Sequence, residues 1–122
     1  MPNFKLGTSF YPIRLSAYMK SEAELTISIE NMGSDVCWVE CDVLVPESIS
    51  LAPDRPLSQG RIRVGIVQPK ETRTGRCKIY SGLKSYPGLY TLKLIALGYG
   101  KDGSISGKLE KAVDLRCATL TQ

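Results

Sequence analysis

Short runs of alternating apolar and polar residues, separated by turn residues, most constrain how this chain can fold. Residues 23–30 (AELTISIE) place Leu25, Ile27 and Ile29 on one face of an extended chain and polar residues on the other. A turn follows at residues 31–34 (NMGS), where Gly33 is available for positive φ. The same alternation recurs along the chain and helical periodicity is weak, which is typical of an all-β protein.

The turn residues divide the chain into seven expected strands. They are residues 4–15, 23–30, 36–45, 61–67, 72–80, 89–99 and 105–118, with Pro12 interrupting the first and a short eighth strand around 49–51. A chain of 122 residues fits one domain, so residues 1–122 are assigned to a single unit. Seven to eight antiparallel strands of this spacing favour an immunoglobulin-like two-sheet sandwich over a closed barrel.

Charge decides which face of strand 36–45 points inward. One face is apolar and carries Cys37, Val39, Cys41, Val43 and Val45. The other face carries Trp38, Glu40 and Asp42. Burying two carboxylates without partners would be costly, so we expect the cysteine face in the core and Trp38 at the surface.

The same reasoning orients three further strands. Residues expected to face inward are Ile62, Val64 and Ile66 on strand 61–67, Tyr90, Leu92, Leu94 and Ala96 on strand 89–99, and Val113, Leu115 and Cys117 on strand 105–118. Residues expected to face outward are Thr91, Lys93, Ile95, Leu97 and Tyr99 on strand 89–99, and Ala112, Asp114 and Arg116 on the last strand.

The outward apolar residues are the first candidate site. They are Trp38, Ile95, Leu97, Tyr99 and Ala112. If their three strands are neighbours, these side chains form one patch, and a contiguous apolar patch with a tryptophan suggests an interface. A homodimer is the simplest form, because two-fold contacts are the commonest. In the alternative, the N-terminal segment or the long connection 46–60 folds over the patch.

Charge is divided unevenly along the chain, although the net charge is only +4. Residues 21–54 hold eight acidic residues and no Lys or Arg, whereas residues 55–101 hold ten basic residues and one acidic residue. Cross-strand pairing would neutralise them, with Glu24 and Glu30 beside Arg76 and Lys78, and Glu40 and Asp42 beside Lys93. Alternatively, a basic edge binds nucleic acid or another polyanion through Arg61, Arg63, Lys70 and Arg73.

Several classes of chemistry are disfavoured. The chain has no histidine, which excludes Ser-His-Asp and Cys-His nucleophile systems and His-ligated metal sites. Glu40 and Asp42 share a face of a flat sheet, where no pocket is expected. The glycines of residues 98–107 suggest a phosphate loop, but no helix follows them, so a hairpin is favoured. We therefore expect no enzyme activity, no catalytic residue, no cofactor and no metal site.

The expected state of the four cysteines depends on the cellular compartment of the protein. No secretory signal is seen in the first residues, and the longest apolar stretch, residues 89–99, is interrupted by polar residues and is too short to span a bilayer. We therefore expect a cytoplasmic protein without a membrane partner. In that setting buried free thiols are favoured, and the alternative is a bridge from Cys37 or Cys41 to Cys77 or Cys117. Cys37 and Cys41 cannot bridge each other, because four residues of a strand span ~13 Å.

Three motifs carry a resemblance. They are IENMGS at residues 29–34, V-x-V-P at residues 43–46 and SYPGLYTLKL at residues 85–94. Residues 23–118 resemble the CARDB-like immunoglobulin-like modules of bacteria and archaea. The resemblance implies a seven-stranded sandwich used as a spacer or interaction module, usually within a larger surface protein, and it supplies no catalytic residues. The four cysteines depart from the family pattern. The hypothesis is a self-associating, non-catalytic interaction or accessory module, with polyanion binding as the alternative.

Overall fold

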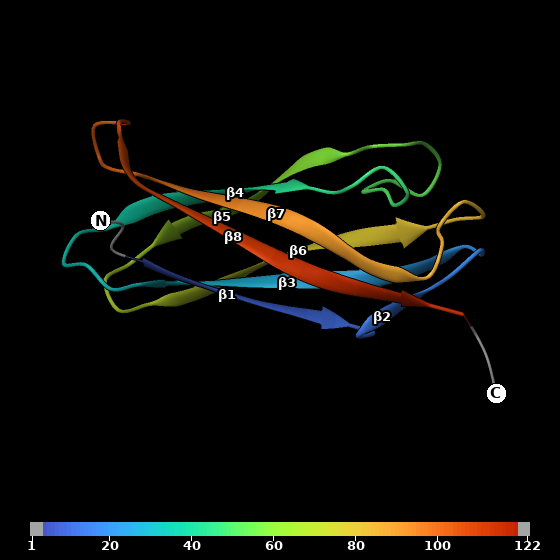
Figure 1. Ribbon diagram of the computed structural model, residues 1–122. Helices are drawn as coiled ribbons and strands as arrows, with labels where there is room; N and C mark the ends of the chain where they lie inside the picture. The colour runs from blue at the N-terminus through green and yellow to red at the C-terminus, as the bar shows by residue number, and fades with distance from the viewer. Residues whose placement is uncertain (1–3, 120–122) are drawn as a thin grey trace.

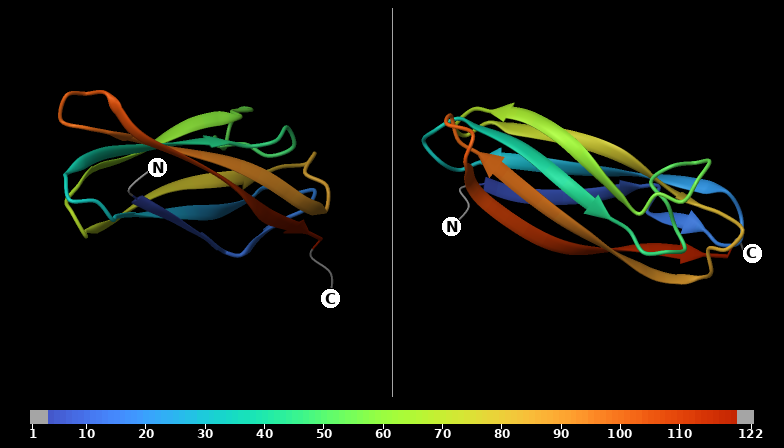
Figure 2. Two further views of the ribbon diagram at one scale, coloured as in Figure 1. Left: turned by 60° about the vertical axis from the view of Figure 1, so that its left-hand side comes forward. Right: turned by 90° about the horizontal axis from the view of Figure 1, so that it is seen from above.

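Two packed sheets, antiparallel except for one short parallel pair, make up residues 4–119, the part of the chain described by the computed structural model (Figure 1). The strands are β1 Phe4–Tyr11, β2 Arg14–Ser16, β3 Ser21–Asn31, β4 Cys37–Leu44, β5 Gln59–Val67, β6 Thr72–Ser81, β7 Gly88–Tyr99 and β8 Ile105–Ala118. One sheet has the order β1-β3-β6 and the other β2-β8-β7-β4-β5 (Figure 2). No helix that could cross a membrane occurs among the described residues.

The expected first strand is divided between the two sheets. β1 pairs with β3 in the three-stranded sheet, whereas β2 pairs in parallel with β8 in the five-stranded sheet. Pro12 lies between them and has no N–H to donate to a continuous ladder. The short strand expected at 49–51 is reduced to a single bridge between Ser50 and Tyr80.

The core lies between the two inner faces, as the alternation predicts. Leu25, Ile27 and Ile29 of β3 are fully buried, and they face the buried side chains of the other sheet. These include Val39, Cys41 and Val43 of β4, Leu92, Leu94 and Ala96 of β7, and Leu115 and Cys117 of β8. The inward and outward assignments on β4, β7 and β8 are confirmed, with Cys37 and Val113 only partly buried.

The inward assignment of Ile66 is wrong. Ile66 is 49% exposed, whereas the next residue, Val67, is fully buried. The β4–β5 register shifts next to Gly65, whose φ is 96°. The resulting β-bulge adds one residue to β5 and reverses the alternation beyond it, so Val64 and Val67 point inward and Ile66 points out.

The turn at residues 31–34 forms as expected, but Asn31 organises it rather than a left-handed Gly33. The Asn31 side chain is only 2% exposed. Its Oδ1 accepts a hydrogen bond from the Gly33 N–H at 2.9 Å. Its Nδ2 donates to the carbonyl oxygens of Asp35 at 2.8 Å and Val67 at 3.0 Å. One side chain therefore ties the end of β3 to the following turn and to the end of β5.

Candidate functional site

A row of apolar side chains crosses the outer face of the five-stranded sheet. Trp38 on β4 lies opposite Tyr99 on β7 and opposite Ile66 on β5. Tyr99 in turn lies opposite Ile105 at the start of β8. Residues directly opposite in an antiparallel pair share a face, so the four side chains form one line across four strands. Trp38 is 41% exposed, Ile66 49% and Ile105 61%. We call these four residues the outer row.

The outer row contains two of the five residues expected at the interface, Trp38 and Tyr99. Leu97 and Ile95 lie on the same outer face of β7 as Tyr99, but each has charged neighbours on both adjacent strands. Glu40 and Lys108 lie beside Leu97, and Asp42 and Glu110 lie beside Ile95. Ala112 lies further along β8, opposite Lys93, and is separated from the row.

Ile66 and Ile105 are members of the row that the sequence alternation missed. The bulge at Gly65 turned Ile66 outward, and a second register shift at Gly98/Tyr99 sets Ile105 opposite Tyr99. Glycine within a strand often marks such a bulge, so Gly65 and Gly98 could have indicated a register shift in both strands.

Within residues 4–119, neither segment considered as a cover lies over the outer row. β1 belongs to the other sheet, where it pairs with β3. The connection 45–58 runs back toward β6, because Ser50 and Tyr80 exchange two backbone hydrogen bonds of 2.9 Å and 2.7 Å. The outer face is thus built by strands alone at this level of the sheet.

An ion-pair ladder occupies the same face next to the outer row. Arg61 of β5 donates from Nε to Asp42 Oδ1 at 2.7 Å and from Nη1 to Glu40 Oε2 at 2.8 Å. The Asp42 carboxylate, helped by Glu40, raises the pKa of Arg61 above its usual value. The expected pairing of both carboxylates with Lys93 is wrong, because β5 lies beside β4 and supplies the arginines. Lys93 instead approaches Glu110 of β8 at 3.4 Å.

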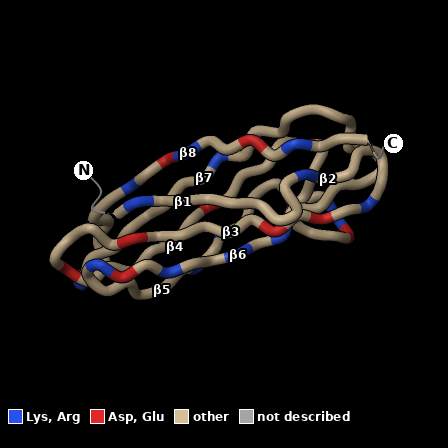
Figure 3. The backbone as a smooth tube through the Cα atoms, turned by 90° about the horizontal axis from the view of Figure 1, so that it is seen from below, with Lys and Arg blue, Asp and Glu red and all other residues tan. Residues whose placement is uncertain are grey.

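The pairing expected between β3 and β6 is confirmed in part. Glu24 approaches Arg76 at 3.9 Å, and Lys78 binds Glu22 at 2.9 Å. Glu30 lies away from both cations, opposite Thr72 of β6 and Lys5 of β1. Figure 3 shows acidic and basic positions close together along these strands. Strand pairing therefore places the acidic residues of one part of the sequence beside the basic residues of another and largely neutralises their charges.

The four cations proposed as a polyanion edge are brought to one side of the sandwich, but on different sheets. β5 is an edge of the five-stranded sheet and β6 an edge of the three-stranded sheet. Arg61 is engaged by two carboxylates, and Arg73 lies 3.3 Å from Glu71. Arg63 is more weakly held, 4.0 Å from Glu40, and Lys70 is exposed in the β5–β6 turn. Ion pairing thus reduces the positive charge that this edge offers to an anionic ligand.

All four cysteines are free thiols, as the favoured interpretation predicts. Cys41 and Cys117 are buried, and Cys37 and Cys77 are partly buried. Burial raises the pKa of Cys41 to about 12 and that of Cys77 to about 11. Thiols with such pKa values are poor nucleophiles at neutral pH, so they act as small apolar groups in the core.

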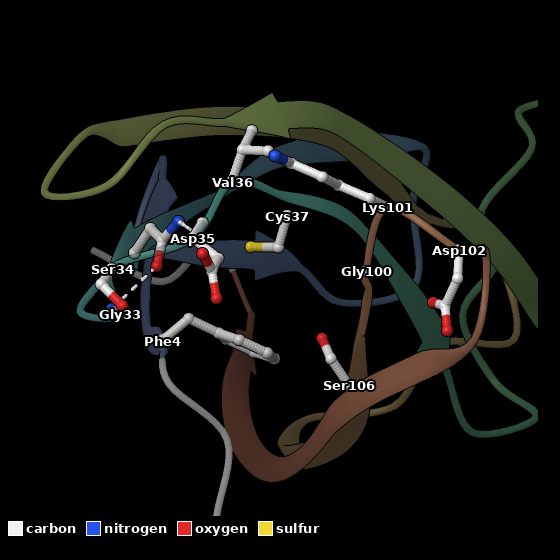
Figure 4. Close-up of a pocket in the computed structure, with 11 residues that line it drawn as sticks. Phe4, Gly33, Ser34, Asp35, Val36, Cys37, Gly100, Lys101, Asp102 and Ser106 are labelled. Atoms are coloured by element: carbon white, nitrogen blue, oxygen red, sulfur yellow. Dashed lines mark hydrogen bonds between the residues drawn. The ribbon is translucent and has the colours of Figure 1, made fainter.

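A cavity of about 410 Å³ opens at one end of the sandwich, between the β3–β4 turn and the β7–β8 hairpin. Figure 4 shows the ring of Phe4, the carboxylate of Asp35, the Cys37 thiol and the Ser106 hydroxyl turned toward it. The glycine-rich segment forms the hairpin that was expected there, with Gly103 at φ 82° in its turn. Burial raises the pKa of Cys37, so these groups do not form an activated nucleophile.

Comparison with known proteins relates the chain to others through its structure. No family model matches the sequence, and no curated protein matches it. The structure is similar to the CARDB domain of a Pyrococcus furiosus protein in complex with di-metal ions, with TM-score 0.62, 10% identity, and coverage of 97% of this chain and 94% of that one. The fold is an immunoglobulin-like β-sandwich.

Two other solved structures agree with this fold. A non-cellulosomal cohesin from Archaeoglobus fulgidus superposes with TM-score 0.50 and 15% identity over 96% of this chain and 86% of that one. A FixG-related protein from Vibrio parahaemolyticus superposes with TM-score 0.58 and 12% identity over 96% and 98%. At these identities the likeness shows the fold alone.

Proposed function

We propose that this protein is a non-catalytic binding or accessory module that self-associates through the outer row. The observation that carries the proposal is the line of Ile66, Trp38, Tyr99 and Ile105 across four strands. Three of these side chains are each more than 40% exposed and lie in one line instead of being scattered. Single exposed apolar residues are common on protein surfaces, whereas a contiguous row with a tryptophan is typical of interfaces.

The surroundings of the row also suit a contact between two copies. The ladder next to it becomes neutral only when Arg63, 4.0 Å from Glu40, is counted with Arg61 against the two carboxylates of Glu40 and Asp42. Two copies meeting through this face would therefore bring together apolar rows bordered by paired charges, without forcing like charges into contact. A two-fold axis through the face makes each row contact the other copy's row, which is the commonest symmetry of oligomers.

The test is the particle mass in solution, measured by light scattering across a dilution series. We expect the wild-type protein to be a dimer that dissociates on dilution, and Trp38→Glu to be a monomer at every concentration. Leu83→Glu is the matched control, because Leu83 is 78% exposed but lies in the β6–β7 loop, at the opposite end of β7 from Tyr99. A wild-type monomer, or a dimer whose mass is unchanged by Trp38→Glu, would remove the outer row as the interface.

A further inference from the structure

Three connections lie toward the end of the sandwich opposite the β7–β8 hairpin. They are the β2–β3 loop and the β6–β7 loop, seen at the right-hand end of Figure 1, and the β1–β2 corner, which lies further in along the sheets. The Tyr18 N–H donates to the Ser85 carbonyl at 2.7 Å, which joins two of the loops directly. The Ala17 N–H donates to the Ala118 carbonyl at 2.8 Å and fixes the β2–β3 loop to the end of β8.

Exposed apolar side chains are concentrated on this end, which we call the loop end. Of the eleven large hydrophobic residues that are exposed in residues 4–119, seven belong to it. They are Tyr11 (82% exposed), Ile13 (79%), Tyr18, Met19, Leu83 (78%), Tyr86 and Leu89. Three of the seven are tyrosines, whose apolar ring and polar hydroxyl suit a boundary between water and an apolar phase.

Positive charge surrounds these apolar tips. Arg14, Arg116 and Leu89 lie side by side across β2, β8 and β7, and Lys20 and Lys84 are exposed in the two neighbouring loops. Within residues 4–119 none of these four cations is in an ion pair, unlike most arginines of β5 and β6.

Few carboxylates oppose these cations. Glu22 is bound by Lys78 at 2.9 Å, and Asp54 is 3.4 Å from Arg55. Glu47 is exposed and lines a shallow groove together with Lys84. The loop end therefore combines projecting apolar residues with a positive charge that the rest of the chain neutralises only in part.

We propose that the loop end docks on the surface of a bilayer that contains anionic lipid. The apolar tips would enter the boundary between headgroups and acyl chains while Arg14, Lys20, Lys84 and Arg116 contact the phosphate and carboxylate groups above it. A protein groove is a poorer match, because the apolar residues project from three separate loops instead of forming one flat or concave surface. The lack of a spanning segment led us to expect no membrane partner, but surface docking needs no such segment.

The experiment is co-sedimentation of the full chain with phosphatidylcholine vesicles prepared with and without phosphatidylserine. We expect binding to the phosphatidylserine vesicles that weakens with added salt, and little binding to phosphatidylcholine alone. Lys84→Ala should weaken the partition coefficient about fivefold, the effect of one cation near an anionic surface. Leu83→Ser should weaken it to a similar or greater degree, because it removes the apolar contact and leaves every charge in place.

Two variants at the opposite end serve as controls. Met32→Ser and Lys101→Ala remove one exposed apolar side chain and one exposed cation near the β3–β4 turn and the β7–β8 hairpin, and both should bind like the wild type. Absence of binding to phosphatidylserine vesicles would overturn the proposal. Equal loss in the control and loop-end variants would do the same. Loss in Lys84→Ala without loss in Leu83→Ser would indicate adsorption by charge alone and would also overturn it.

Discussion

Replacement of Asn31 by alanine tests the account of how the two sheets are held at one end. The Asn31 side chain is 2% exposed and makes three hydrogen bonds, to the Gly33 N–H and to the carbonyl oxygens of Asp35 and Val67. Asn31→Ala removes all three bonds without adding bulk. The backbone of Asn31 still bonds Glu71 and Lys70, so the end of β3 keeps its place in the chain.

The expected loss follows from the number of bonds and their burial. A protein hydrogen bond contributes ~1 kcal/mol net, and a buried polar group left without a partner costs ~1–3 kcal/mol. Three lost bonds, of which the one to Val67 is buried, therefore give about 3 kcal/mol in the free energy of unfolding. For a domain of this size, such a loss lowers the melting temperature by roughly 10 °C.

Urea unfolding followed by far-UV circular dichroism measures this free energy. Asp102→Ala is the matched control: Asp102 Oδ1 caps the β7–β8 turn through the N–H and hydroxyl of Ser104, but the group is exposed to solvent. We expect a much smaller loss there. Asn31→Asp keeps the acceptor for Gly33 but turns a carboxylate toward two carbonyl oxygens, so its deficit relative to wild type should shrink on acidification. A loss below about 1 kcal/mol in Asn31→Ala would refute the role given to this side chain.

Three further predictions concern the thiols, the bulge and the basic edge. Because burial raises the pKa of Cys41 to about 12, native protein should react with iodoacetamide far more slowly than unfolded chain. The free energy of unfolding that the protein gains from keeping the Cys41 thiol neutral should be lost as the pH rises from 9.0 toward about 12. Unfolding curves measured at alkaline pH can check this. Gly65→Ala should cost ~1–2 kcal/mol because φ is 96°, while Gly82→Ala, with open space around it, should cost little; equal costs would contradict the bulge account. On heparin we expect elution at modest salt, since Arg61 and Arg73 are already paired; retention to high salt that is lost in Arg63→Ala but kept in Lys84→Ala would favour the polyanion edge over the loop end.

The strands that the sequence predicts well are those with one buried face and no irregularity. On β3, β4 and β7, apolar and polar residues alternate over most of the strand, and a strand shifted by one residue would bury charges such as Glu40. Burial therefore fixes both the strand and its orientation. The adjacency of β4, β7 and β8, on which the expected patch depended, is found in the structure, but alternation alone does not dictate it.

The neighbour of β5 in the sheet could not be predicted from the alternation of apolar and polar residues. A strand of residues 61–67 has the same inner face whether it joins β4 or β6, and only the long connection 45–58 decides between them. One signal was available: Glu40 and Asp42 are two residues apart, and so are Arg61 and Arg63 on the later strand. Such spacing matches the rungs of an antiparallel ladder, and the structure places Glu40 opposite Arg63 and Asp42 opposite Arg61.

The outer row has a second physical role that any test of self-association must separate from the first. Trp38 and Tyr99 are direct cross-strand neighbours, and such aromatic pairs stabilise a sheet by roughly 0.2–1 kcal/mol even when nothing covers them. Trp38→Thr distinguishes the two roles, because threonine keeps strand propensity but loses most of the apolar surface. If the row serves only strand pairing, Trp38→Thr lowers stability and leaves the particle mass unchanged. If it is also an interface, the mass falls as well, and the concentration-independent part of the stability drops by no more than this cross-strand contribution.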